Sequence, residues 1–194
     1  EWARNWTAEE GRHSIVMRDY MTVSRAVDPV ALERARMIQV RGGQVPDPGD
    51  AIEALAYVSM QELATRISHR NTGKLMKDEI GTAIMSRVGN DENLHYLFYR
   101  DLTTAAIEVD PSTAVIAIER AVRNFEMPGT GIPGFKQHAE AIARAEIYSL
   151  AQHHDQILQP VVVKWWRIEA LQGLSAEAEQ AREKLLTQIT RIGQ

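Results

Sequence analysis

The segment Asp91-Glu92-Asn93-Leu94-His95 (DENLH) stands at the centre of a helical pattern of bulky side chains. Large, mostly apolar residues recur on both sides of it at steps of four and three, which is the period of one face of an α-helix. The same steps recur near the start of the chain, around Glu10-Gly11-Arg12-His13. The two stripes are Ile84, Val88, Glu92, His95, Tyr99 and Leu102, and Trp2, Trp6, Glu10, His13, Met17 and Tyr20. We expect two helices, each with Glu-x-x-His in the middle of its apolar face.

This repeated polar interruption indicates a metal site. A carboxylate that is buried without a partner is strongly destabilising, so it either becomes protonated or binds a cation. Glu and His three positions apart share a helix face and can hold one metal ion together. Helical bundles of the di-iron carboxylate type combine Glu-x-x-His from each of two helices with a single Glu from each of two others. One Glu-x-x-His alone is usually an exposed pair, but two copies on matching stripes favour a metal.

Glu62 is the candidate for a single glutamate ligand. It lies in the mostly uncharged stretch 57–65 (YVSMQELAT), and it falls between the two Glu-x-x-His motifs along the chain. A second single glutamate is not evident, because Glu79, Glu108 and Glu119 lie at helix ends or among polar neighbours. The sequence therefore supplies five of the six ligands that this type of site needs. The five are Glu10, His13, Glu62, Glu92 and His95.

Other polar and aromatic residues have a plainer interpretation. Thr65 either bonds the backbone of its own helix or, one turn from Glu62, lines a pocket beside the metal. Trp2 and Trp6 are interpreted as core residues rather than redox relays. Four further histidines have no matching acidic pattern and are interpreted as surface or packing residues: His69, His138, His153 and His154.

The rest of the chain predicts one all-α domain over residues 1–194, because strand signals are weak and no linker divides it. Segment 42–49 (GGQVPDPG) is predicted as a loop from its Gly and Pro content. Segment 129–134 formally matches a dinucleotide-binding fingerprint, but it follows no strand, so no cofactor site is assigned there. The predicted helices are 1–23, 28–41, 50–71, 78–108, 112–125, 133–153, 155–172 and 176–191.

Composition excludes several classes of protein. The 194 residues contain no Cys, which rules out disulfides, iron–sulfur clusters and thiolate zinc sites, and which fits a cytoplasmic location. The net charge is −4, and the sequence has no cluster of basic residues that could bind along a nucleic-acid phosphate backbone. A nucleic-acid partner is therefore not expected. No apolar run approaches the about 20 residues of a membrane span.

Three segments resemble the soluble acyl-acyl-carrier-protein (acyl-ACP) desaturases, most closely those of actinobacteria. Segment 6–13 (WTAEEGRH) is similar to the family signature WTAEE-N-RH, with Gly11 where the family usually has Asn. Segment 61–72 (QELATRISHRNT) resembles the second ligand helix, and Asp91–His95 resembles the family motif DE-x-x-H. Shorter similarities at 166–168 and 173–177 extend the resemblance over nearly the whole chain.

The resemblance implies a ferritin-like bundle with two non-haem iron ions, which introduces a cis double bond into a saturated acyl chain carried on acyl carrier protein (ACP). It implies that Glu10 and Glu92 bridge the irons, that His13 is terminal on one iron, and that Glu62 and His95 are terminal on the other. Thr65 would be the hydroxyl near the oxygen site. Asp91 would bond a ligand histidine and fix its tautomer, and Glu9 takes the corresponding place in the other motif.

The resemblance also implies partners. The family uses O₂ and two electrons from ferredoxin, and a chain without Cys needs a separate iron–sulfur donor. The family is usually a homodimer. ACP is acidic, so a basic surface is expected to receive it, although a solvated helix face is the plainer interpretation of these residues. The candidates are Arg66, Arg70, Lys74 and Lys77.

One departure limits the resemblance. The family places a helix with the sixth ligand before the WTAEE motif, whereas this chain begins at Glu1, so we expect an N-terminally truncated domain and an incomplete bundle. Three alternatives follow. The chain could be a truncated or divergent ferritin-like protein that binds metal without desaturase activity, or another ferritin-like oxidase such as a ribonucleotide reductase small subunit. A plain helical interaction module is the third, and it would not explain the two interrupted stripes.

Overall fold

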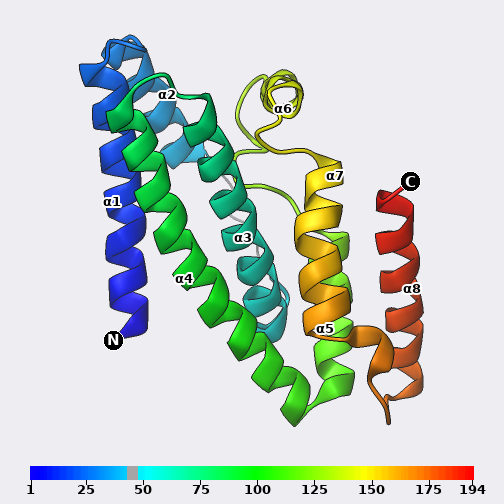
Figure 1. Cartoon of the computed structure of the whole chain (residues 1–194). Coiled ribbons are helices and arrows are strands. Elements are labelled where there is room, and N and C mark those ends of the chain that lie inside the picture. The colour runs from blue at the N-terminus through cyan, green and yellow to red at the C-terminus, as the bar shows by residue number, and fades with distance from the viewer. Residues whose placement is uncertain (43–47) are drawn as a thin grey trace.

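The structure, a computed structural model, describes residues 1–42 and 48–194. Across these residues it contains helices and no strand, which confirms the all-α prediction (Figure 1). The elements are α1 (Trp2–Val23), α2 (Pro29–Gly42), α3 (Ala51–Leu75), α4 (Glu79–Val109), α5 (Pro111–Arg123), α6 (Phe135–Arg144), α7 (Leu150–His153), the π-helix η1 (His154–Trp165), the 3₁₀ turn η2 (Ile168–Ala170) and α8 (Ala176–Ile192).

The long helices α3 and α4 form the centre of the molecule and share its most extensive contact. Both begin at an aspartate whose side chain accepts a hydrogen bond from the backbone: Asp50 from Glu53 N at 2.9 Å, and Asp78 from Gly81 N at 2.8 Å. A short connection between them returns the chain, so the two helices run antiparallel (Figure 1). This pair carries Glu62 on one helix and Glu92 with His95 on the other.

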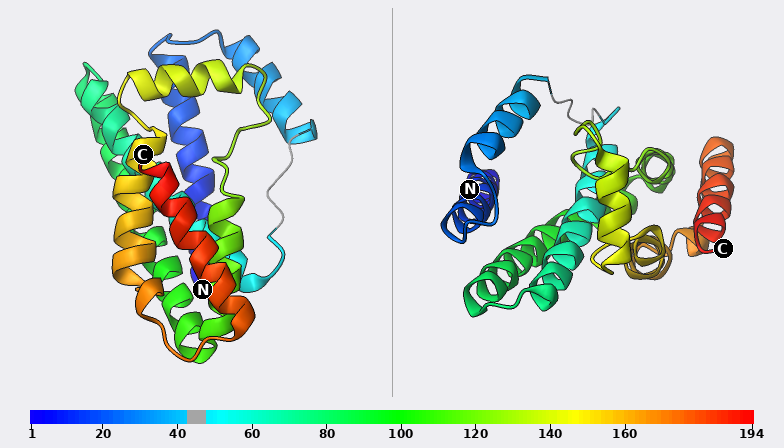
Figure 2. Two further views of the ribbon diagram at one scale, coloured as in Figure 1. Left: turned by 90° about the vertical axis from the view of Figure 1, so that its right-hand side faces the viewer. Right: turned by 90° about the horizontal axis from the view of Figure 1, so that it is seen from above.

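The hydrophobic core lies on one side of the α3–α4 pair. There α5 and η1 pack against α3, and α8 packs on α5 and η1. Together these elements bury aliphatic side chains such as Ile118, Leu158 and Leu185. Helix α1 lies on the opposite side, against α4, and its only buried residue is His13. Helix α2 has no buried residue. The view from above shows α1 and α2 at one end and α8 at the other (Figure 2).

The predicted helix 133–153 is wrong, because the structure divides it. Helix α6 ends at Arg144, and Glu146 then takes a left-handed backbone conformation with φ of 57°. Ser149 starts the next helix, since its hydroxyl accepts a hydrogen bond from Gln152 N at 3.2 Å. Asn71 of α3 donates to Ile147 O at 3.0 Å. The break is thus held by a cap and by a contact with a distant helix, and helical periodicity reports neither.

The predicted helix 155–172 is also wrong in its form. Residues 154–165 are a π-helix, and the backbone bond from Trp166 N to Val161 O at 2.8 Å spans five residues. Pro160 lies inside it and has no N–H to donate, which disfavours regular α-helical bonding there. Arg167 then takes a left-handed conformation with φ of 51°, which ends the helix.

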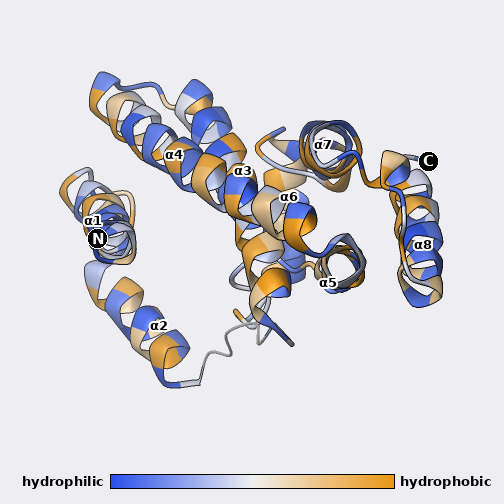
Figure 3. Cartoon of the chain, turned by 90° about the horizontal axis from the view of Figure 1, so that it is seen from below, coloured by the Kyte–Doolittle hydropathy of each residue, from blue (hydrophilic) through white to orange (hydrophobic). Residues whose placement is uncertain are grey.

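The other helices match their predicted bounds to within a few residues. Of the predicted loop 42–49, Gly42 closes α2, and residues 43–47 lie outside the described part of the chain. Figure 3 shows apolar and polar segments alternating along each helix. No helix among the described residues is long and apolar enough to cross a membrane.

A buried histidine lies at the junction of α7 and η1. His153 is 5% exposed, Phe125 stacks on its ring at 4.5 Å, and its Nδ1 lies 2.7 Å from the Tyr148 hydroxyl. Burial, with a smaller contribution from neighbouring His154, lowers the pKa of His153 to about 4. The interpretation of His153 as a packing residue agrees with this position.

This histidine makes stability depend on pH in a defined direction. The unfolded chain protonates His153 near pH 6.5, whereas the fold keeps it neutral down to about pH 4. Its contribution is therefore fully present above pH 6.5 and is lost as the pH falls toward 4. Between pH 7.5 and 5, urea unfolding should show that wild type loses about 2 kcal/mol more stability than His153→Gln. His138→Gln, an exposed control, should behave like wild type; equal losses in wild type and His153→Gln would contradict the prediction.

Candidate metal site

Three helices bring the predicted metal ligands together. One ligand atom each from Glu10 of α1, Glu62 of α3, and Glu92 and His95 of α4 lie within 4.8 Å of one another. His13 of α1 lies beside this group, with its Nδ1 3.5 Å from Glu92 Oε1 and 3.9 Å from Glu10 Oε2. The structure therefore places all five residues at one point between α1, α3 and α4. We call these five residues the carboxylate–histidine cluster.

The two histidines of the cluster have the same orientation. His95 Nε2 lies 2.9 Å from Glu9 Oε2, while its Nδ1 faces Glu10 at 3.2 Å and Glu92 at 3.3 Å. His13 Nε2 lies 3.2 Å from Asp91 Oδ2, while its Nδ1 faces the cluster. Ionised carboxylates accept hydrogen bonds only, so each Nε2 carries a proton that points at the outer carboxylate. Each Nδ1 faces the cluster, where a metal ion would replace any proton that it carries. An outer carboxylate behind a ligand imidazole is the usual arrangement around protein-bound metals.

Several buried polar atoms of the cluster lack a hydrogen-bond partner: Glu10 Oε1, Glu62 Oε2 and His13 Nδ1. Such atoms are rare in folded proteins, because each loses its bonds to water without replacement. Three of the seven such atoms that occur among the described residues are thus donors of the predicted ligands. Carboxylate oxygens with imidazole nitrogens suit iron, manganese or zinc. The donor set thus fits a bound metal better than a closed hydrogen-bond network.

The charges of the cluster are in conflict without a cation. Burial, opposed by His95 and reinforced by Glu92 and Glu10, raises the pKa of Glu62 to about 7. Burial alone would lower the pKa of His95, but the carboxylates of Glu10, Glu62, Glu92 and Glu9 outweigh it and raise that pKa to about 12. Imidazoles likewise hold the pKa of Glu92 well below its usual range despite burial. Protonated His95 therefore places positive charge among these carboxylates.

Aromatic side chains of α1 and α4 cover one end of the cluster. Trp6 Nε1 donates to Glu62 Oε1 at 3.0 Å, which leaves Glu62 Oε2 as the unpartnered oxygen. Trp2 stacks on Phe98 at 4.0 Å and meets the edge of His95 at 6.0 Å. The interpretation of the tryptophans as plain core residues is therefore incomplete, because Trp6 also orients a candidate ligand.

Two α3 residues near Glu62 differ in what they contact. The Thr65 hydroxyl lies 3.0 Å from Glu62 O and 3.2 Å from Gln61 O, so it bonds the backbone of its own helix, as one of the two interpretations expects. His69 Nε2 lies 3.5 Å from Glu92 Oε1, at the edge of the cluster. The sequence interpretation of His69 as a surface or packing residue missed this contact. Its spacing of seven from Glu62, which puts both on one helix face, was the available signal.

The basic residues that follow Glu62 do not form one exposed patch. Arg66 is half-buried, and burial lowers its pKa. Arg70 donates to Asn90 Oδ1 at 3.2 Å, and Lys74 donates to Asn71 Oδ1 at 2.9 Å. Arg70, Lys74 and Lys77 are exposed.

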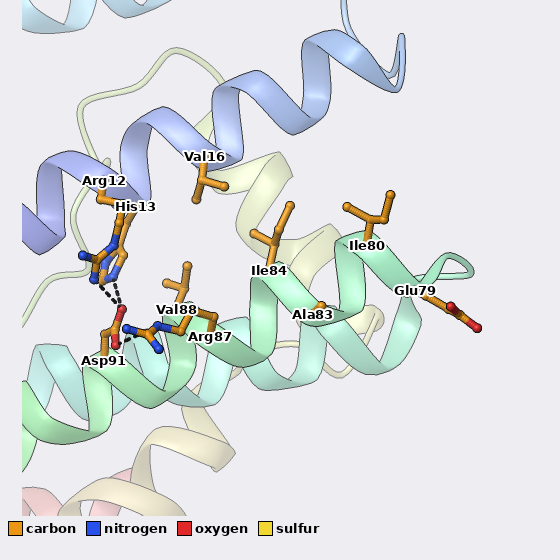
Figure 4. Close-up of a pocket in the computed structure, with 10 residues that line it drawn as sticks. All are labelled: Arg12, His13, Val16, Glu79, Ile80, Ala83, Ile84, Arg87, Val88 and Asp91. Carbon is orange, nitrogen blue, oxygen red and sulfur yellow. Dashed lines mark hydrogen bonds and ion pairs between the residues drawn. The ribbon is translucent and has the colours of Figure 1, made fainter.

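An apolar cleft of about 450 Å³ between α1 and α4 leads to the cluster. Val16, Ile84 and Val88 line it, and Figure 4 shows Arg12 and His13 of α1 pointing across its inner end toward Asp91 of α4. Arg12 Nη2 donates to Asp91 Oδ2 at 2.9 Å. The cleft therefore ends at the buried pair of His13 and Asp91.

Fold and site together define a helical-bundle protein with a carboxylate–histidine cluster between its helices. The chain belongs to the fatty acid desaturase family, whose sequence model matches residues 1–194. The chain is 40% identical over 193 residues to DesA1 of Mycobacterium tuberculosis, which is named as an acyl-[acyl-carrier-protein] desaturase. This match covers 95% of the chain and 57% of DesA1. The chain is 35% identical to stearoyl-[acyl-carrier-protein] 9-desaturase 6 of Arabidopsis thaliana, with 94% of this chain and 49% of that protein covered.

A solved structure has the same fold. The X-ray structure of DesA2 from Mycobacterium tuberculosis, described as an acyl-ACP desaturase, superposes on this chain with a TM-score of 0.74 at 25% identity. The match covers 93% of this chain and 68% of DesA2. The ferritin-like helical fold and the family resemblance are thereby confirmed. Membership of this family excludes the ribonucleotide reductase alternative. The chain spans about half the length of the curated relatives that it matches.

The charge conflict predicts that a ligand can be replaced with a gain in stability. The pKa of Glu62 lies above its unfolded value, so its ionisation opposes folding, and stability is lost as the pH rises through about 7. In chelator-treated protein at pH 8.5, Glu62→Gln should therefore raise the free energy of unfolding by about 1–3 kcal/mol. At pH 4, below the unfolded pKa of 4.5, the gain should nearly vanish because the carboxyl is protonated in both states. Glu108→Gln, which replaces an exposed carboxylate on α4, is the control. A loss of stability in Glu62→Gln at pH 8.5 would show that ionised Glu62 does not destabilise the fold.

Proposed function

We propose that this chain carries the iron site of an acyl-ACP desaturase, which introduces a cis double bond into a saturated acyl chain during fatty acid biosynthesis. The observation that supports the proposal is the convergence of the five predicted ligands, with both imidazole Nδ1 atoms directed inward. The names of its relatives, acyl-ACP and stearoyl-ACP desaturases, support the substrate class.

The proposed assignment uses each residue of the cluster. Glu10 and Glu92 lie between the two histidines and would bridge two iron ions. His13 would hold one ion, and Glu62 with His95 would hold the other. When bound, the two irons would activate O₂ to remove hydrogen from an unactivated CH₂ group. Carboxylate and imidazole ligands suit both ferrous and ferric iron.

The protein's own part in the reaction is orientation and exclusion of water. Glu9 and Asp91 hold the Nε2 protons of His95 and His13, which keeps both Nδ1 atoms available. Trp6 fixes one oxygen of Glu62 and leaves the other free. Trp2 and Phe98 close the His95 end with apolar surface. The Thr65 hydroxyl, one turn from Glu62, would reach an oxygen site only by leaving its backbone partners.

The proposal includes partners. The acyl chain would arrive on ACP, and three exposed cations at the end of α3 and just after it would receive this acidic carrier: Arg70, Lys74 and Lys77. Two electrons would come from a ferredoxin-type donor, since the chain has no Cys for an iron–sulfur cluster. We also propose a homodimer in the cytoplasm. The alternative, a ferritin-like protein that binds metal without desaturation, shares the cluster and differs in turnover.

Iron content tests the metal site directly. After anaerobic loading with Fe²⁺ and desalting, wild type should retain about two irons per chain, measured by elemental analysis. Glu92→Ala should retain almost none, because Glu92 lies within reach of both histidines. Glu108→Ala, on the same helix outside the cluster, should load like wild type. Full iron content in Glu92→Ala would refute the assignment.

Turnover tests the reaction. Iron-loaded protein with stearoyl- or palmitoyl-ACP, O₂, ferredoxin and its reductase should yield the monounsaturated acyl product, detected by mass spectrometry. Glu62→Ala should lose activity by at least about a hundredfold, because it removes a ligand. Two irons per chain without product would favour the metal-binding alternative over the desaturase.

A further inference from the structure

We propose that Arg12 is a positioning residue: it holds Asp91 and Glu9, the two carboxylates that orient His13 and His95. The inference rests on the proposed metal site and adds a residue to it. Arg12 lies between the glutamate and the histidine of the first Glu-x-x-His motif, and it faces the second motif across the α1–α4 contact.

A continuous line of contacts runs through this side chain. Arg12 Nη2 lies 2.9 Å from Asp91 Oδ2, which lies 3.2 Å from His13 Nε2. The same Nη2 lies 3.5 Å from Glu9 Oε1, and the other oxygen of Glu9 lies 2.9 Å from His95 Nε2. One guanidinium therefore contacts both outer carboxylates, and each of these holds one imidazole. Figure 4 shows the Asp91 half of this arrangement.

The chemistry of arginine suits this position. A guanidinium is planar, always charged and has five N–H donors, so it can hold two carboxylates in fixed directions. Asp91 has a side chain only 6% exposed, whereas that of Glu9 is 29% exposed. Glu9 is therefore free on its outer side, and Arg12 is the cation that keeps it turned toward His95. A lysine ammonium is a compact point charge, so it would contact the nearer carboxylate, Asp91, without also holding Glu9.

Arg87 offers a matched control on the neighbouring helix. Its Nε lies 3.4 Å from Asp91 Oδ1, so it carries the same charge to the same carboxylate. Its side chain is 72% exposed, and its ion pair is with Asp91 on its own helix. Removal of Arg87 thus removes a positive charge near the cluster without removing the link between the two carboxylates.

The sign of the effect separates positioning from simple charge. A guanidinium near a metal site repels the cation, so loss of its charge alone would strengthen metal binding. Loss of a positioning residue has the opposite effect, because outer partners of metal ligands contribute about 10–100-fold to affinity. Weaker binding in Arg12→Gln would therefore report the link and not the charge.

The test uses Co²⁺ as the probe in the full chain. Optical titration gives affinity, and proton NMR of the Co²⁺ protein shows the solvent-exchangeable ring N–H signals of the two ligand histidines. We expect Arg12→Gln to weaken Co²⁺ binding about tenfold or more and to speed exchange of both N–H signals. Arg12→Lys should keep the signal that is hydrogen-bonded to Asp91 slow and speed only the one bonded to Glu9. Arg87→Gln should leave both signals close to wild type and should leave binding unchanged or slightly stronger, because it removes charge but not the link between the two carboxylates.

A background without the two outer acids completes the test. In Glu9→Gln/Asp91→Asn, further replacement of Arg12 by Gln should not weaken binding, because Arg12 acts through those carboxylates. Circular dichroism of metal-free samples checks folding, and if Arg12→Gln loses helix, the Arg12→Lys pattern decides. Unchanged or stronger binding in Arg12→Gln, or faster exchange of one signal alone, would overturn the proposal. If wild type fails to bind Co²⁺, the metal site itself is refuted and the role of Arg12 falls with it.

Discussion

The arrangement of the helices depends on how this molecule accommodates three carboxylates that lie close together between them. Glu10, Glu62 and Glu92 stand around His95, and their mutual repulsion would favour separation of the helices unless positive charge lay among them. The α3–α4 pair can hold two of them because its other side packs against the aliphatic core of α5, η1 and α8. The pair is thus stabilised on one side by apolar packing, and it is destabilised on the other by repulsion among buried carboxylates.

Periodicity was sufficient to predict the helices that carry the site. Their apolar stripes are long, and Asp50 and Asp78 mark where α3 and α4 begin, so α1, α3 and α4 were placed to within a few residues. The break before Ser149 and the π-helix around Pro160 were not predicted. The first depends on a contact with Asn71, and the second on a change of hydrogen-bond register. Neither leaves a repeat in the local sequence.

The candidate site was likewise predicted only in part from the sequence. The five members of the carboxylate–histidine cluster follow from a motif that occurs twice and from one glutamate in an uncharged stretch. His69 was missed because the acid that it meets, Glu92, belongs to another helix. Trp6 was placed in the core, but its bond to Glu62 joins residues 56 positions apart. Residues that act through partners on other helices need the packing before their role can be stated.

The weak burial of α1 affects the order in which the parts of the molecule unfold. This helix supplies Glu9, Glu10 and His13, yet His13 is its only buried residue, so its attachment to α4 depends heavily on polar contacts. An ion shared by Glu10, Glu62 and Glu92 would act as a cross-link between α1 and the central pair. Without that cross-link we expect α1 to open before the central pair, so its amide protons should exchange with solvent sooner than those of α3 and α4. A bound ion would then make α1 open together with the rest of the bundle.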